Sequence, residues 1–289
     1  MLWLEQIVSG LSVGAVYALI ALGYTLVFGV LRLINLAHCD VMMVGAYAGF
    51  LCAQHLGQGL LVCTLFAAAL CAALGVLIER VCYRPLRGAA GMPLLVVSLG
   101  VSLLLQYGMM LLFGAEARAY PPGIAGGVVT LGAVRIPVIK LAALGAGIVF
   151  TALLQLMLTK TRAGRAMRAV ADDSTAARLC GVSEQGAVSL AFAAGCALAG
   201  AAGAVYGSMY LLSPLMGVAP GLKAFAAAVI GGIGSVPGAV LGGFVLGLGE
   251  AFAGAVFGTA SRDIVSFALL IGFLLVRPGG LTNAKAGTK

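Results

Sequence analysis

The most charged stretch of this 289-residue chain is Thr159–Gln185, which could bind a partner protein. Arg165, Arg168 and Asp172 fall three and four residues apart, so they share one face of a helix. A second short helix should follow, capped at its start by Asp173 or Ser174 and ended by Gly181 in the left-handed conformation. The candidate contact residues are Arg165, Arg168, Asp172, Asp173, Arg178 and Gly181. We expect either a helix that docks into a partner's groove or a solvated basic loop.

A second group of polar residues interrupts sequence that is otherwise apolar. Its members, the candidates for a translocation pathway, are Asn35, His38, Asp40 and Glu250. Polar groups inside a membrane are costly and tend to face cavities or partners. Structural roles are equally open: Asn35 as the cap of the following helix, and Glu250 as a hydrogen-bonding partner of a neighbouring helix. The sequence leaves both interpretations open.

A glycine-rich segment, GGIGSVPG, interrupts a third apolar run and is expected to break a helix. The residues assigned to this break are Gly231, Gly232, Gly234, Ser235, Pro237 and Gly238. The segment has no lysine and cannot form a phosphate-binding P-loop. Two dispersed histidines do not make a metal site of the usual kind, and the seven cysteines are expected to be small buried apolar residues. We therefore predict neither enzymatic activity nor a bound cofactor or metal.

Composition defines the environment of these residues. Hydrophobic residues make up 62% of the chain and charged residues only 9%, against about 25% charged in a soluble domain. A cytosolic enzyme, a nucleic-acid binder and a disordered chain are poor matches to these values. The 43 glycines favour membrane helices that pack closely and are broken in places. Spacings such as Gly10/Gly14 and Gly243/Gly247 predict such packing, either within the chain or at a subunit interface.

Apolar runs long enough to span a membrane alternate with basic clusters. The clusters at 79–93, 159–185 and 277–289 should face the cytoplasm, and the loops at 114–137 and 213–222 should face outward. This arrangement requires an odd number of crossings between Lys223 and Val276. Within the first outward loop, Val128–Ile136 is expected to form a small hairpin around Gly132. We predict one all-α, polytopic membrane domain over 1–289, with about eight transmembrane helices, broken or re-entrant segments and eight or nine passes.

Five ordered pieces of the chain resemble the permeases of bacterial ABC importers for branched-chain amino acids. They are RAMRAVADDSTAARLCGVS, a Gly-rich first helix followed by Asn-x-Ala-His and Met-x-Gly-Ala-Tyr, RPLRG, GLKAFAAAVIGGIGSVPGAVLGG, and Glu250 soon after. The resemblance covers nearly the whole chain. Cys39–Asp40 departs from it, because glycine and a carboxylate are expected there, and only the carboxylate is kept.

The resemblance implies a permease subunit in the bacterial inner (plasma) membrane that carries branched-chain amino acids or a related small amide or urea-type solute. Its implied partners are a second homologous permease, two ABC ATPase subunits that use ATP, a periplasmic substrate-binding protein and membrane lipid, but no nucleic acid. By the same resemblance, Ala163–Gly181 is the segment that couples to the ATPase, within a cytoplasmic coupling loop at 159–185. An ion-coupled secondary transporter that uses Asp40 and Glu250 is the alternative, and a channel or structural membrane subunit is a third possibility; neither needs a docking helix.

Overall fold

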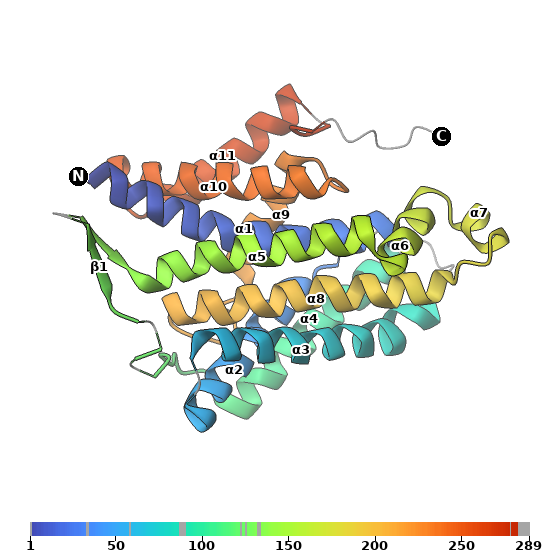
Figure 1. The fold of residues 1–289 in the computed structure, drawn as a ribbon, viewed down its shortest axis with the longest axis horizontal. Helices are drawn as coiled ribbons and strands as arrows, with labels where there is room; N and C mark the ends of the chain where they lie inside the picture. The colour runs from blue at the N-terminus through green and yellow to red at the C-terminus, as the bar shows by residue number, and fades with distance from the viewer. Residues whose placement is uncertain are drawn as a thin grey trace.

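The chain forms a bundle of helices with one small hairpin, as seen in a computed structural model that describes residues 2–32, 35–57, 59–86, 91–121, 123–124, 126–131, 134–277 and 279–282 (Figure 1). Six of its helices are long and apolar enough to cross a membrane. They are α1 (Leu2–Leu31), α3 (Leu60–Ile78), α4 (Gly91–Phe113), α5 (Val138–Lys160), α8 (Glu184–Met209) and α10 (Val236–Phe257). The expected all-α multi-pass membrane fold is confirmed.

Shorter elements complete the bundle and its ends. The further helices are α2 (His38–Leu56), α6 (Arg162–Asp172), α7 (Ser174–Leu179), α9 (Val218–Gly231) and α11 (Ser261–Val276). A π-helical turn, Glu79–Tyr83, and a 3-10 turn, Arg84–Leu86, extend α3. The expected hairpin is confirmed as β1 (Val128–Leu131) paired antiparallel with β2 (Val134–Pro137), while Gly132 lies outside the described residues.

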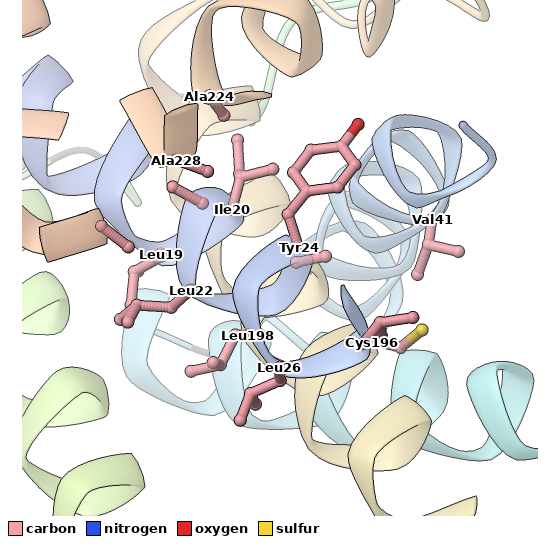
Figure 2. Packing of buried hydrophobic residues seen from close by; sticks show 14 of the residues in the cluster. Leu19, Ile20, Leu22, Tyr24, Leu26, Val41, Cys196, Leu198, Ala224 and Ala228 are labelled. Carbon is pink, nitrogen blue, oxygen red and sulfur yellow. The ribbon is translucent and has the colours of Figure 1, made fainter. Parts of the chain in front are cut away.

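The core is built around α1, which packs against α8, α9 and α10. Figure 2 shows Leu19, Ile20 and Leu22 of α1 together with Leu198 of α8 and Ala228 of α9. Small residues bring the helix backbones into direct contact. A Cβ on Gly243 of α10 would lie 2.6 Å from the Ala18 nitrogen. One on Gly247 would lie 2.4 Å from the Gly10 carbonyl oxygen, so the four-residue glycine spacing serves close packing within the chain.

The chain path gives the bundle two distinct ends. Figure 1 places the N-terminal end of α1 and the β hairpin at one end, and α6 and α7 at the other. After α8 returns from the α6–α7 end, α9, α10 and α11 follow as three separate helices. Of these, α10 is long and apolar enough to span a membrane and α9 is a shorter apolar helix, so the odd number of crossings expected between Lys223 and Val276 stays a prediction. The turns after α3 lie at the α6–α7 end, where Arg84 donates a hydrogen bond to Gln185, and the N-terminal end of α1 lies at the opposite end (Figure 1).

The basic cluster at 79–93 is helical up to Leu86, because π and 3-10 turns continue α3 past the charged residues Glu79 and Arg80. One boundary expected from the sequence was wrong. The loop expected at 213–222 ends earlier, since α9 begins at Val218. Pro220 is compatible with this start, because the first turn of a helix does not need the missing N–H.

Candidate functional site

The charged segment folds as two short helices at one end of the bundle. In α6, the buried residues Gly164, Met167 and Val170 face the bundle, while Arg165 and Arg168 are exposed. Asp172 is exposed as well, so the charged face expected from the spacing is presented outward. A Cβ on Gly164 would lie 2.2 Å from the Met157 carbonyl oxygen, which makes glycine necessary where α6 turns back across the end of α5.

The second short helix, α7, is fixed by its caps. The Asp173 carboxylate accepts hydrogen bonds from the backbone N–H groups of Thr175 at 2.8 Å and Ala176 at 3.0 Å. Gly181 follows with a φ of 79°, in the left-handed region that favours glycine. Arg178 lies 3.6 Å from Glu184, an exposed ion pair that contributes little to stability. Asp173 therefore supports the shape of the segment, and the exposed side chains beside it are available to a partner.

The glycine-rich break lies next to α6. A cavity of about 140 Å³ is lined by Met167, Arg168 and Ala171 of α6 together with Gly234 and Val236 at the break. The structure thus brings together two segments that are about 60 positions apart in the chain.

The break itself is an ordered turn. Helix α9 ends at Gly231, and Gly232 and Gly234 follow with φ of 100° and 99°. Ser235 then caps α10 by accepting a hydrogen bond from the Gly238 N–H at 3.2 Å, with Pro237 in the first turn. The chain after α11 bonds to the end of α9. Leu281 donates its N–H to the Ile230 carbonyl at 2.8 Å, and the Thr282 hydroxyl donates to the Gly231 carbonyl at 2.8 Å.

Asn35, just before α2, bonds to the turn after α3, and Asp40 connects α2 to α4. The Asn35 side-chain oxygen accepts hydrogen bonds from the Tyr83 hydroxyl at 2.9 Å and from the Ala37 N–H at 3.1 Å. The buried Asp40 carboxylate accepts from the Ser102 hydroxyl at 2.5 Å and from the Gln106 amide at 3.0 Å. Both oxygens of Asp40 are thus bonded within the bundle, which is how a buried carboxylate in a membrane helix is expected to be satisfied.

His38 belongs to the tightly packed interior. Its ring is fully buried, with its centroid 4.7 Å from that of Tyr24. A Cβ on Gly23 would lie 2.2 Å from its Nε2 atom, so the histidine occupies space that this glycine leaves free. Next to it, Cys39 and the Tyr24 hydroxyl are 2.6 Å apart. Five of the seven cysteines are buried, Cys82 is half-buried and Cys180 is exposed.

Glu250 lies in a different part of the bundle, at the end opposite α6 and α7. One of its oxygens accepts a hydrogen bond from the Tyr17 hydroxyl at 3.0 Å, and the other from the Ser266 hydroxyl at 2.5 Å. The Lys223 ammonium lies 3.0 Å from the latter oxygen and 2.7 Å from Asp263. Glu250 and Lys223 are buried, so each charge needs the other, and removal of either partner would leave an uncompensated charge.

This ion-paired cluster forms one wall of a polar cavity of about 330 Å³. The cavity is lined from α1, α5, α8, α9, α10 and α11, and its charged lining residues are Lys140, Lys223, Glu250 and Arg262. The hydroxyl groups of Tyr17, Tyr206 and Tyr210 also belong to the lining. Its volume is at the lower end of the range of roughly 300–1,000 Å³ found for small-molecule sites.

The model of one protein family matches residues 6–274: the permease component of the branched-chain amino acid transport system. This match covers both ends of the bundle, including α6, α7 and the Glu250 cavity. The chain belongs to this family. The resemblance of the five motifs to such permeases is therefore confirmed.

Curated relatives support the same assignment over the full length of the permease. The chain is 40% identical to the high-affinity branched-chain amino acid transport system permease protein BraD of Pseudomonas aeruginosa, covering 96% of this chain and 95% of that protein. It is 39% identical to the corresponding LivH of Escherichia coli K12 over the same shares. Among solved structures, PsaBC from Streptococcus pneumoniae in complex with Fab matches with a TM-score of 0.52 over 96% of this chain and 93% of that one, at 13% identity, which shows a shared fold alone.

The structure separates the residues that the sequence grouped as one pathway. Asp40 ties α2 to α4 and Asn35 bonds to Tyr83 in the turn after α3, whereas Glu250 lines the cavity between α1, α8, α9 and α10. Three of the cavity residues, Lys223, Lys140 and Arg262, were not predicted from the sequence. A charged residue inside an apolar run was the signal that identified Glu250, and a lysine inside such a run gives the same signal.

Proposed function

We propose that this permease is the membrane-spanning subunit of an ABC importer that moves branched-chain amino acids into the cytoplasm across the bacterial inner membrane. The observation that carries the proposal is the full-length relationship to BraD and LivH, whose names state this transport system. Separate ATPase subunits would supply the energy, a second permease would complete the pore, and a periplasmic binding protein would deliver the substrate. The subunit itself would catalyse no reaction and bind no cofactor.

The α6–α7 segment is the proposed contact with the ATPase subunits. Its charged face is exposed through Arg165 and Arg168, while its apolar face is anchored on α5 and α8. The small cavity that this segment lines together with Gly234 and Val236 gives a route from it to the broken helix pair α9–α10. Nucleotide-driven closure of the ATPase pair would then shift the population between inward-facing and outward-facing states.

The test is ATP-dependent uptake of leucine by the complete importer in proteoliposomes. The double variant Arg165→Glu with Asp172→Lys reverses the charges of the exposed face and should abolish uptake while membrane insertion and assembly with the second permease persist. Arg118→Glu, an exposed arginine at the opposite end, is the matched control and should leave uptake unchanged. Normal uptake by the double variant would contradict the docking role. Uptake that needs no ATP but follows a proton or sodium gradient would instead support an ion-coupled carrier.

A further inference from the structure

The polar cavity beside Glu250 contains more positive than negative charge. Lys140, Lys223 and Arg262 line it, against Glu250 alone; Asp263, outside the lining, pairs with Lys223. Even with Asp263 included, three cations face two carboxylates. Charges within membrane-spanning bundles are expensive, and an unbalanced set marks a pathway for a charged solute.

Two of the cations lack a carboxylate partner within the described residues. The Lys140 ammonium donates to the Ser9 hydroxyl at 2.5 Å, a neutral partner. The Arg262 Nε–H is buried and has no hydrogen-bond partner in the part of the chain that the structure describes. Lys223, by contrast, is neutralised by its two ion pairs. The cavity thus offers two cationic hydrogen-bond donors to a ligand. A carboxylate is the group that such donors bind best.

The remaining lining suits the other end of an amino acid. Tyr206 and Tyr210 lie with ring centroids 4.5 Å apart, and Tyr17 donates to Glu250 nearby. Aromatic faces and a carboxylate together attract an ammonium group. The cavity is lined from the starts of α1 and α5. These starts lie at the end of the bundle opposite α6 and α7, which is the side from which an importer receives its substrate (Figure 1).

We propose that this cavity is an entry site for the zwitterionic amino acid, with Lys140 and Arg262 binding its carboxylate and with the tyrosines and Glu250 facing its ammonium group. The inference rests on the proposed importer function and names where within the permease the substrate first binds. Lys223 is a positioning residue, because its ammonium pairs with Glu250 and Asp263 and holds both carboxylates in place.

The test uses the complete importer, with the concentration of leucine-loaded binding protein varied. Wild-type uptake comes first: if no branched-chain amino acid is taken up with ATP, the proposed function is wrong and the entry site fails with it. If uptake occurs, Arg262→Gln and Lys140→Gln should each lower the maximal rate about tenfold, since each removes a charged hydrogen bond to the substrate. The concentration of binding protein that gives half the maximal rate should stay within about twofold of wild type, because docking is not touched.

Arg135→Gln is the matched control, since Arg135 is exposed at the same end of the bundle but does not line the cavity. Its rate should equal that of wild type. Arg262→Lys keeps the charge and should recover most of the rate, which separates a binding role from a folding defect. Cavity variants that transport like Arg135→Gln would overturn the proposal. A raised half-saturating concentration with an unchanged maximal rate would also overturn it, because the cations would then dock the binding protein.

Direct binding provides a second measurement on the purified importer without its binding protein. Labelled leucine should be displaced by isocaproate, which keeps the carboxylate of leucine and lacks its amine, and much less by isoamylamine, which keeps only the amine. Arg262→Gln should weaken the competition by isocaproate about tenfold, the loss expected for one charged hydrogen bond. Equal displacement by both compounds, or competition by isocaproate that is unchanged in Arg262→Gln, would refute the carboxylate assignment.

Discussion

Asp173 allows the shape of the α6–α7 segment to be separated from its charge. Its carboxylate caps α7 through two backbone N–H groups, and α7 is only six residues long. A helix this short is marginal by itself, so its folded population depends directly on its cap. Asp173→Ala removes the acceptor and should cost about 0.5–2 kcal/mol. That loss corresponds to a roughly 2- to 30-fold smaller population of folded α7 relative to unfolded α7.

The companion variant is Asp173→Asn, which keeps a side-chain oxygen for the cap and removes the negative charge. Asparagine is as good a cap as aspartate, so only the charge at the start of the helix is lost, about 0.3–1 kcal/mol. ATP-dependent uptake of leucine should therefore fall clearly in Asp173→Ala and by no more than about fivefold in Asp173→Asn. Amide hydrogen exchange over 174–179 should be faster in the alanine variant than in the asparagine variant.

The outcome that refutes this reasoning is equal damage in both variants. Asp173 would then act by its charge toward a partner, and its hydrogen bonds to Thr175 and Ala176 would be incidental. Rapid exchange in α7 of the alanine variant with full transport activity would also refute it, because the shape of α7 would then be irrelevant to coupling.

Two further predictions concern stability, measured as thermal unfolding of the purified protein in detergent. Gly203→Ala should destabilise the protein by about 1–3 kcal/mol, because the new Cβ would lie 2.0 Å from the Met42 carbonyl oxygen. Gly100→Ala, on an open face of α4, should be neutral or stabilising. A lower stability of Gly100→Ala than of Gly203→Ala would contradict the packing. Ser102→Ala should lower the stability by about 1–3 kcal/mol, because the buried Asp40 carboxylate loses a hydrogen-bond donor. Ser102→Thr keeps the hydroxyl and should lower the stability less. Equal losses of stability would show that the hydrogen bond does not matter.

Features encoded locally could be predicted from the sequence. The spacing of Arg165 and Arg168, the cap at Asp173 and the left-handed Gly181 each depend on residues within a few positions, and the fold reproduces them. The hairpin at β1 and β2 depends on local alternation in the same way.

The partners of the buried polar groups could not be predicted, because they come from distant segments. Glu250 bonds to Tyr17, 233 positions away, and Asp40 bonds to Ser102, 62 positions away. In a chain where apolar residues dominate every helix, periodicity does not show which face of a helix meets which neighbour. The grouping of Asp40 with Glu250 as one pathway therefore stays a prediction.

The backbone contacts between α1 and α10 also determine where a change of shape costs least. Helices that touch through Gly10, Gly14, Gly243 and Gly247 cannot slide by one residue without driving a side chain into a backbone. By contrast, only 22% of the most apolar window of α4 and of α5 is buried, against 78% for α1. Helices α1 and α10 thus form a rigid pair, whereas α4 and α5 lie on the outside of the bundle, where they can tilt against lipid or a neighbouring subunit.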